Sequence, residues 1–210
     1  MTLLSLLLAA MAGAARSAEF TVDVLDVDGA PLPGAVVFLE PHDPASLADA
    51  SPAPGVMDQV ESQFMPHILV VQRGAAVAFP NSDSIKHHVF SFSPAKSFEI
   101  KLYKGERAEP LIFEERGEVE LGCNVHDWML GYIYVVDSPF FSRTDEDGRS
   151  RIEAPSTEYT LGVWHPRIDA PDSLLTQSVN PDVRDVRITL KNPLLSEYVP
   201  SEAVEFDDYD

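Results

Sequence analysis

Three side chains that bind soft metal ions follow one another at regular spacing in the stretch V-E-L-G-C-N-V-H-D-W-M-L-G-Y, residues 119–132. Cys123 is the only cysteine of the chain, His126 lies three residues after it, and Met129 lies three residues after His126. A thiolate, an imidazole nitrogen and a thioether are the soft and borderline donors that suit copper. We therefore predict that a short loop presents these three side chains to one copper ion, whereas a lone cysteine without such neighbours is most often an inert core residue.

A trigonal copper site needs a second histidine, and it must come from another part of the chain. The candidate stretch is F-P-N-S-D-S-I-K-H-H-V-F-S-F-S, residues 79–93, which holds His87 and His88 side by side. Neighbouring side chains of a strand point to opposite faces, so only one of the two rings can reach the loop. The alternation alone does not decide which one it is.

Short β-strands must position these residues. In the run E-V-E-L-G-C, residues 118–123, alternation places Val119, Leu121 and Cys123 on one face, so the thiol ends an inward-facing row. Six further runs separated by turn signals predict strands at 67–71, 75–79, 87–92, 97–103, 110–115 and 131–136. Such spacing is typical of a Greek-key sandwich or barrel.

The flanking sequence also predicts β-structure. Residues 20–24 and 35–39 are apolar runs around a Gly/Pro-rich turn, and we expect a hairpin-like pair there. Further strands are expected around 151, at 159–164 and at 185–190, while the Pro/Ala/Ser-rich residues 41–56 predict a linker. Residues 191–210 are predicted to be an acidic flexible tail. With 17 prolines, 11 glycines and no long helical period, the whole chain is predicted to be all-β.

Composition and the first residues bear on compartment and partners. The chain has 210 residues and a formal net charge of −19, which argues against nucleic acid and anionic membrane surfaces as partners. Residues 1–18 hold an apolar run too short to span a bilayer and ending in small residues, which predicts a signal peptide and no membrane span after its removal. We therefore expect an exported, periplasmic protein. In an oxidising compartment its lone cysteine must be protected by burial or by a metal.

The stretch N-S-D-S-I-K-H-H-V, residues 81–89, together with C-N-V-H-D-W-M, residues 123–129, resembles the cupredoxins, the type 1 blue copper proteins. The short ligand loop is most similar to that of amicyanin, and the resemblance covers residues 57–137. It implies that His87, six residues after Asn81, is the fourth ligand beside Cys123, His126 and Met129. It also implies one type 1 copper, with His126 as the electron port and Met129 as the weak axial ligand.

Two positions depart from that family pattern. His88 stands where the family commonly has an asparagine that helps to fix the ligand loop. Asp127 stands where amicyanin has a proline after its second histidine. Residues at these two positions orient the ligands and tune the reduction potential. The resemblance therefore implies the ligand set but not the reduction potential.

The flanks resemble a different module. V-D-G-A-P-L-P-G-A-V-V within residues 19–40, and T-D-E-D-G and Y-T-L-G-V-W-H-P within residues 138–190, are similar to the carboxypeptidase regulatory-like, transthyretin-like domain. Together the arrangement looks like bacterial exported proteins labelled methylamine utilisation proteins. The resemblance implies a copper domain inserted into this module. In the competing layout residues 19–40 belong to one extended cupredoxin sandwich.

The predicted function is outer-sphere electron transfer by a periplasmic Cu(I)/Cu(II) carrier, because four protein ligands leave no vacant position for a substrate. Redox proteins such as a cytochrome are the expected partners, and the oligomeric state stays open. The alternatives are copper storage, delivery or sensing, and a structural or interaction module with a metal-stabilised insert. Enzyme motifs such as G-x-S-x-G and H-E-x-x-H do not occur in the sequence, so no catalytic role is predicted. The other histidines stand alone and are interpreted as surface or structural: His42, His67 and His165.

Overall fold

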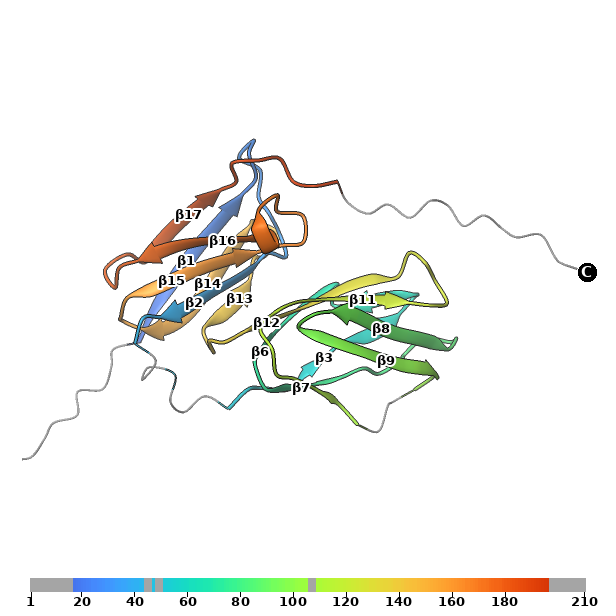
Figure 1. Cartoon of the computed structure of the whole chain (residues 1–210). Coiled ribbons are helices and arrows are strands. Elements are labelled where there is room, and N and C mark those ends of the chain that lie inside the picture. The colour runs from blue at the N-terminus through green and yellow to red at the C-terminus, as the bar shows by residue number, and fades with distance from the viewer. Residues whose placement is uncertain (1–16, 44–46, 48–50, 106–108, 197–210) are drawn as a thin grey trace, which may run out of the picture.

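A computed structural model describes residues 17–43, 47, 51–105 and 109–196 of the chain (Figure 1). The described chain consists mainly of β-strands joined by turns, with a short 3-10 helix at Pro171–Ser173, which confirms the all-β prediction. No helix in these residues is long and apolar enough to cross a membrane. Most of the predicted signal peptide, part of the predicted linker and most of the predicted tail lie outside the described residues.

Seven strands from the two flanking parts of the sequence form one sandwich, called here the outer sandwich. They are β1 (Ser17–Leu25), β2 (Val36–Pro41), β13 (Phe141–Arg143), β14 (Arg149–Pro155), β15 (Tyr159–Trp164), β16 (Leu174–Val179) and β17 (Asp185–Thr189). One sheet has the order β14-β1-β17 and the other has the order β13-β2-β15-β16. Phe20, Val22 and Val24 alternate inward along β1 and pack in the core between the two sheets.

The middle of the sequence forms a second sandwich, called here the inner sandwich. Its strands are β3 (Gly55–Val56), β4 (Asp58–Val60), β5 (Gln63–Met65), β6 (Ile68–Gln72), β7 (Ala75–Ala78), β8 (His87–Ser93), β9 (Lys96–Tyr103), β10 (Leu111–Phe113), β11 (Gly117–Cys123) and β12 (Leu130–Val136). A five-stranded sheet has the order β6-β12-β11-β8-β9, a three-stranded sheet has the order β10-β7-β3, and β4 and β5 form a hairpin.

Strand β12 packs on both of its faces, because the two sandwiches share a hydrophobic layer. Ile133 and Val135 face the core of the inner sandwich. Tyr132 and Tyr134, which point the other way, pack with Trp164 of β15 in the shared layer. The ring planes of Tyr134 and Trp164 are stacked, with their centroids 4.5 Å apart. The four sheets therefore form successive layers with three cores between them, and the two sandwiches lie side by side in Figure 1.

A close approach across β2 and β15 makes the shared layer possible. A Cβ atom at Gly162 would lie 2.1 Å from the ring of Phe38, so the ring occupies the space that any other residue would fill. Phe38 and Trp164 then project from the same sheet toward β12. The absence of a side chain at Gly162 thus lets two aromatic rings fill the layer between the sandwiches.

The structure corrects the predicted hairpin-like pair of residues 20–24 and 35–39. Strands β1 and β2 lie in opposite sheets of the outer sandwich, and each faces the same core. The turn between them crosses from one sheet to the other, because both runs are apolar toward a core that lies between two sheets. In the described chain β1 and β2 pair only with strands that follow residue 140.

Candidate metal centre

Two neighbouring strands bring His87 and Cys123 together. Strands β8 and β11 pair antiparallel, with Cys123 opposite Val89 and Gly122 opposite Phe90. His87 lies at the start of β8 and Cys123 at the end of β11, so both reach the same end of the five-stranded sheet. The chain then forms the loop 124–129 and returns as β12, as the sequence predicts. The hydrogen bond from the Met129 amide to the carbonyl of His126, 3.0 Å long, closes this ligand loop.

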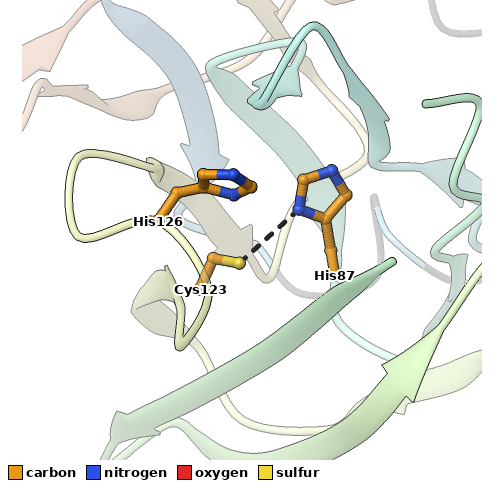
Figure 2. A group of neighbouring side chains, drawn as sticks. All are labelled: His87, Cys123 and His126. Atoms are coloured by element: carbon orange, nitrogen blue, oxygen red, sulfur yellow. Dashed lines mark hydrogen bonds between the residues drawn. The ribbon is translucent and has the colours of Figure 1, made fainter. Parts of the chain in front are cut away.

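Three of the four predicted ligands converge at this point (Figure 2). One ligand atom from each of His87, Cys123 and His126 lies within 4.8 Å of the others. The Nδ1 atom of His87 is 3.7 Å from Sγ of Cys123. Two ligand atoms that share one ion at about 2.0–2.3 Å lie at most about 4.5 Å apart. A common metal therefore requires only small adjustments of these side chains.

The side chains of the two adjacent histidines, His87 and His88, point to different sides of β8. His87 is fully buried, and its ring faces Cys123. His88 points the other way, where its Nε2 atom lies 2.9 Å from a carboxylate oxygen of Glu99 on β9. The side chain of Asn124 lies 3.4 Å from the same ring nitrogen, and its backbone N–H donates to the His88 carbonyl. His88 thus connects β9 to the ligand loop from outside the cluster.

A carboxylate fixes the orientation of the His87 ring. Oδ2 of Asp83 lies 2.9 Å from Nε2 of His87. An ionised carboxylate can only accept, so Nε2 carries a hydrogen, and in the neutral ring Nδ1 has a lone pair on the Cys123 side. The backbone N–H of Ser62 also donates to Asp83, over 2.8 Å. This bond first and His87 second hold the pKa of Asp83 below its usual value, so the carboxylate is charged at neutral pH.

The loop before β8 is itself held by a buried amide. The Nδ2 atom of Asn81 donates to the carbonyls of Ile85 and Tyr103, at 3.0 and 2.9 Å. Its Oδ1 atom accepts from the backbone N–H of Asp83, at 3.0 Å. Glu61 and Ser62 adopt left-handed φ values of 51° and 55° in the turn between β4 and β5. Together these features place the Asp83 carboxylate against His87.

His126 has the properties of a metal ligand. Its Nδ1 atom is buried and has no hydrogen-bond partner. A buried polar atom without a partner is rare in proteins and calls for an explanation such as a bound ion. Burial first, and the nearby His87 second, lower the pKa of His126, which favours the neutral imidazole that binds metals. The Trp128 ring, 38% exposed, lies 4.9 Å from the His126 ring.

Met129 and Cys123 lie in the same hydrophobic cluster below the loop. Both side chains are almost completely buried, Met129 at 2% exposure. The backbone N–H of Val125 lies 3.4 Å from Sγ of Cys123, in position to donate to a thiolate. Phe90 covers Gly122, because a Cβ there would lie 2.6 Å from its ring. The sulfur donors are thus shielded from water. The role of Met129 as a ligand stays a prediction.

The donor set of this cluster fits copper. It combines one thiolate with two imidazoles, and a thioether lies in the same buried cluster as the thiolate, which is the pattern of trigonal copper sites with a weak axial sulfur. The unpartnered Nδ1 of His126 and the lone pair of His87 Nδ1 are both available to such an ion. Sequence reasoning did not assign Asp83, although a carboxylate four residues before the ligand histidine was visible in the stretch N-S-D-S-I-K-H.

Comparisons with known proteins give copper proteins among the solved structures. No model of a known protein family matches the chain, and no curated protein matches it. A reduced Cu(I) form of an amicyanin variant at pH 4 is 24% identical, covers 48% of this chain and 98% of its own, and has a TM-score of 0.36. The oxidized form of another amicyanin variant is 23% identical, with the same coverage and TM-score. A purple cupredoxin from Nitrosopumilus maritimus is 22% identical, covers 42% of this chain and 100% of its own, and has a TM-score of 0.34.

Proposed function

We propose that this chain is an exported copper protein that carries single electrons through one type 1 site. The observation that carries the proposal is the convergence of Cys123, His87 and His126, each with one ligand atom within 4.8 Å of the others. The unpartnered Nδ1 of His126 supports it, because a metal would satisfy that atom. Copper bound here would supply a one-electron couple, Cu(I)/Cu(II), and the redox partner would supply or accept the electron.

The residues around the cluster would keep its geometry the same in both oxidation states. His87 is held through Asp83, and Cys123 ends a strand that pairs on both sides, with β8 and β12. Both side chains are buried, so water does not reorganise around them when the charge of the site changes. A fixed site of this kind suits outer-sphere electron transfer. His126, the most exposed member of the cluster, together with Trp128, would offer the path to the surface.

We also propose the domain layout in which a cupredoxin unit, residues 57–137, is inserted into a transthyretin-like unit of residues 19–40 and 138–190. It is supported by the pairing of β1 and β2 with the late strands of the chain, which form a core of their own. The apolar run in residues 1–18 supports export to the periplasm. Redox proteins such as a small cytochrome would then be the partners.

Redox kinetics test the carrier role. The copper-loaded protein is titrated through its reduction potential and then mixed with a small cytochrome in a stopped-flow instrument. A carrier keeps its copper through repeated cycles and exchanges electrons rapidly. Loss of copper on reduction, with slow exchange, would indicate storage or delivery. A metal-free protein that keeps its fold and partner binding, with no exchange when loaded, would indicate a structural module.

A further inference from the structure

A groove of about 610 Å³ runs between the ligand loop and the outer sandwich. Trp128 and Met129 of the ligand loop line one part of it. His165 and Arg167, which follow β15 in the outer sandwich, line another part. We call it the inter-sandwich groove. It matters for the site because anything bound there would lie against the ligand loop.

The lining of the inter-sandwich groove contains no acidic residue, which is unusual for this acidic chain. None of its fourteen residues is Asp or Glu, although the sequence contains 34 of them. The groove on the other side of the ligand loop has an acidic lining, because it contains Glu118, Glu120 and Asp127 and no Lys or Arg. In a protein with a net charge of −19, an acid-free concave surface is where an anionic group meets the least repulsion.

His165 directs a donor into this groove. Its Nδ1 atom accepts the backbone N–H of Arg167, at 3.2 Å, so Nε2 carries the hydrogen in the neutral ring. Among the described residues the His165 side chain makes no other hydrogen bond, although the residue is only 8% exposed. Burial lowers the pKa of His165 to about 4, which keeps the ring neutral at pH 7. The neutral ring therefore offers one N–H donor among the residues that line the groove.

The C-terminal part of the same chain contains carboxylates that can accept hydrogen bonds, and it begins at the inter-sandwich groove. Arg167 and Leu195 are joined by two hydrogen bonds of 2.8 Å, one from the Leu195 amide to the Arg167 carbonyl and one from Nε of Arg167 to the Leu195 carbonyl. Ser196 lines the groove, and residues 197–210, called here the acidic segment, follow it in the sequence. That segment has six carboxylates, no basic residue and three aromatic side chains: Tyr198, Phe206 and Tyr209.

We propose that the acidic segment docks in the inter-sandwich groove of its own chain. A carboxylate of the segment accepts from Nε2 of His165 and lies near the Arg167 guanidinium, while an aromatic side chain packs on Trp128. The proposal requires no metal, so it stands or falls independently of the copper site.

The tether makes this docking feasible with few contacts. An extended chain reaches about 3.3 Å per residue, so the acidic segment can follow the whole groove from its anchor at Ser196. A directly attached segment has an effective concentration of the order of millimolar. Contacts that would bind a free peptide only weakly therefore suffice for occupancy within one chain.

Fluorescence quenching of the metal-free full chain tests the proposal. The full chain is compared with a variant in which every carboxylate of the acidic segment becomes the matching amide, and with a form that ends at Ser196. Acrylamide quenches the exposed Trp128, while the fully buried Trp164 contributes a constant background that a Trp128→Phe variant identifies. We expect the quenching constant of Trp128 to rise in both altered forms. Equal quenching in all three would overturn the proposal.

A synthetic peptide of residues 197–210 locates the binding surface. Added to the form that ends at Ser196, it should shift the NMR signals of the Trp128 indole and the His165 ring. Arg167→Gln should abolish these shifts, whereas Glu120→Gln in the opposite groove should leave them unchanged. Shifts that survive Arg167→Gln would contradict the assigned groove. Protection of Trp128 in the full chain that falls on dilution would show docking between copies and would also overturn the proposal.

Discussion

The Nδ1 atom of His87 lies 3.7 Å from Sγ of Cys123, and the Nε2 atom of the same ring lies 2.9 Å from the carboxylate of Asp83. The imidazole is thus held from behind while its lone pair faces the thiol. A carboxylate behind a ligand histidine fixes its orientation and makes it a stronger donor.

Removing the negative charge behind His87 should raise the reduction potential. In Asp83→Asn the ring keeps a neutral partner but becomes a weaker donor, so Cu(II) loses more affinity than Cu(I). Loss of such a supporting group typically costs about 10–100-fold in metal affinity. Each tenfold preferential loss of Cu(II) corresponds to about 59 mV for a one-electron couple. Spectroelectrochemical titration measures the shift.

A nearby carboxylate provides the control for Asp83. Asp58 accepts hydrogen bonds from Ser82 in the same loop region, at 2.7 and 3.2 Å, but has no contact with His87 among the described residues. Asp58→Asn should therefore leave the potential close to that of the unmodified protein. Equal shifts in both variants would mean that loop charge, and not the hydrogen bond to His87, sets the potential.

The two adjacent histidines should differ in their effect on copper. His87→Ala removes the ring that faces Cys123, and we expect tight copper binding to be lost. His88→Ala removes only the contacts to Glu99 and Asn124, so the protein should still bind one copper, with an altered ligand loop. Copper titration followed by metal analysis measures the stoichiometry. Retention of tight binding in His87→Ala, with loss in His88→Ala, would reverse the assignment.

The shared aromatic layer should couple the two sandwiches. Trp164 is fully buried and stacks on Tyr134 of β12. Trp164→Ala should cost about 3–5 kcal/mol of unfolding free energy, as for other large aromatic residues in cores. It should also split denaturant unfolding into two transitions, because each sandwich has a core of its own. Trp128→Ala, at an exposed position, should cost much less. A single unshifted transition in Trp164→Ala would contradict the coupling.

Acidification should weaken the fold through His165. Its pKa falls from about 6.5 in the unfolded chain to about 4 in the fold, because burial disfavours the charged ring. Between these two values the unfolded chain binds more protons, so stability drops as the pH falls from 6.5 toward 4. Going from pH 7 to pH 5 should cost about 2 kcal/mol from this group. In the form that ends at Ser196, urea unfolding of His165→Gln should lack this part of the loss, and identical pH profiles would refute it.

The sequence predicted the strands best where one face alone is buried. The alternation of β1 and the row Val119, Leu121 and Cys123 identified inward faces, because a period of two requires only one covered face. The sequence pattern could not identify which residues cover the other face of β12. Tyr132 and Tyr134 lie on one face of β12, but their partner Trp164 comes from a distant part of the chain. The hairpin-like pair of β1 and β2 failed for the same reason.

The candidate site shows the same division. Cys123 and His126 could be predicted together because only three positions separate the end of β11 from the histidine in the loop that follows. The role of Met129, three residues further on, stays a prediction. The choice of His87 over His88 came only from the resemblance to the cupredoxins, and the structure places the His87 ring beside Cys123. Asp83 was missed because its contact depends on a loop conformation that Asn81 and Ser62 maintain. Such a conformation has no periodic signature in the sequence.

The visible and EPR spectra of the copper-loaded protein show whether Cys123 binds copper in a type 1 site. Purified protein without its signal peptide is mixed with Cu(II), and the spectra are recorded for the unmodified chain and for Cys123→Ser. We predict an intense thiolate-to-copper charge-transfer band with the EPR signature of a type 1 site, and its complete loss in the variant. A colourless Cu(II) complex of the unmodified protein, or a band that persists in Cys123→Ser, would contradict the account.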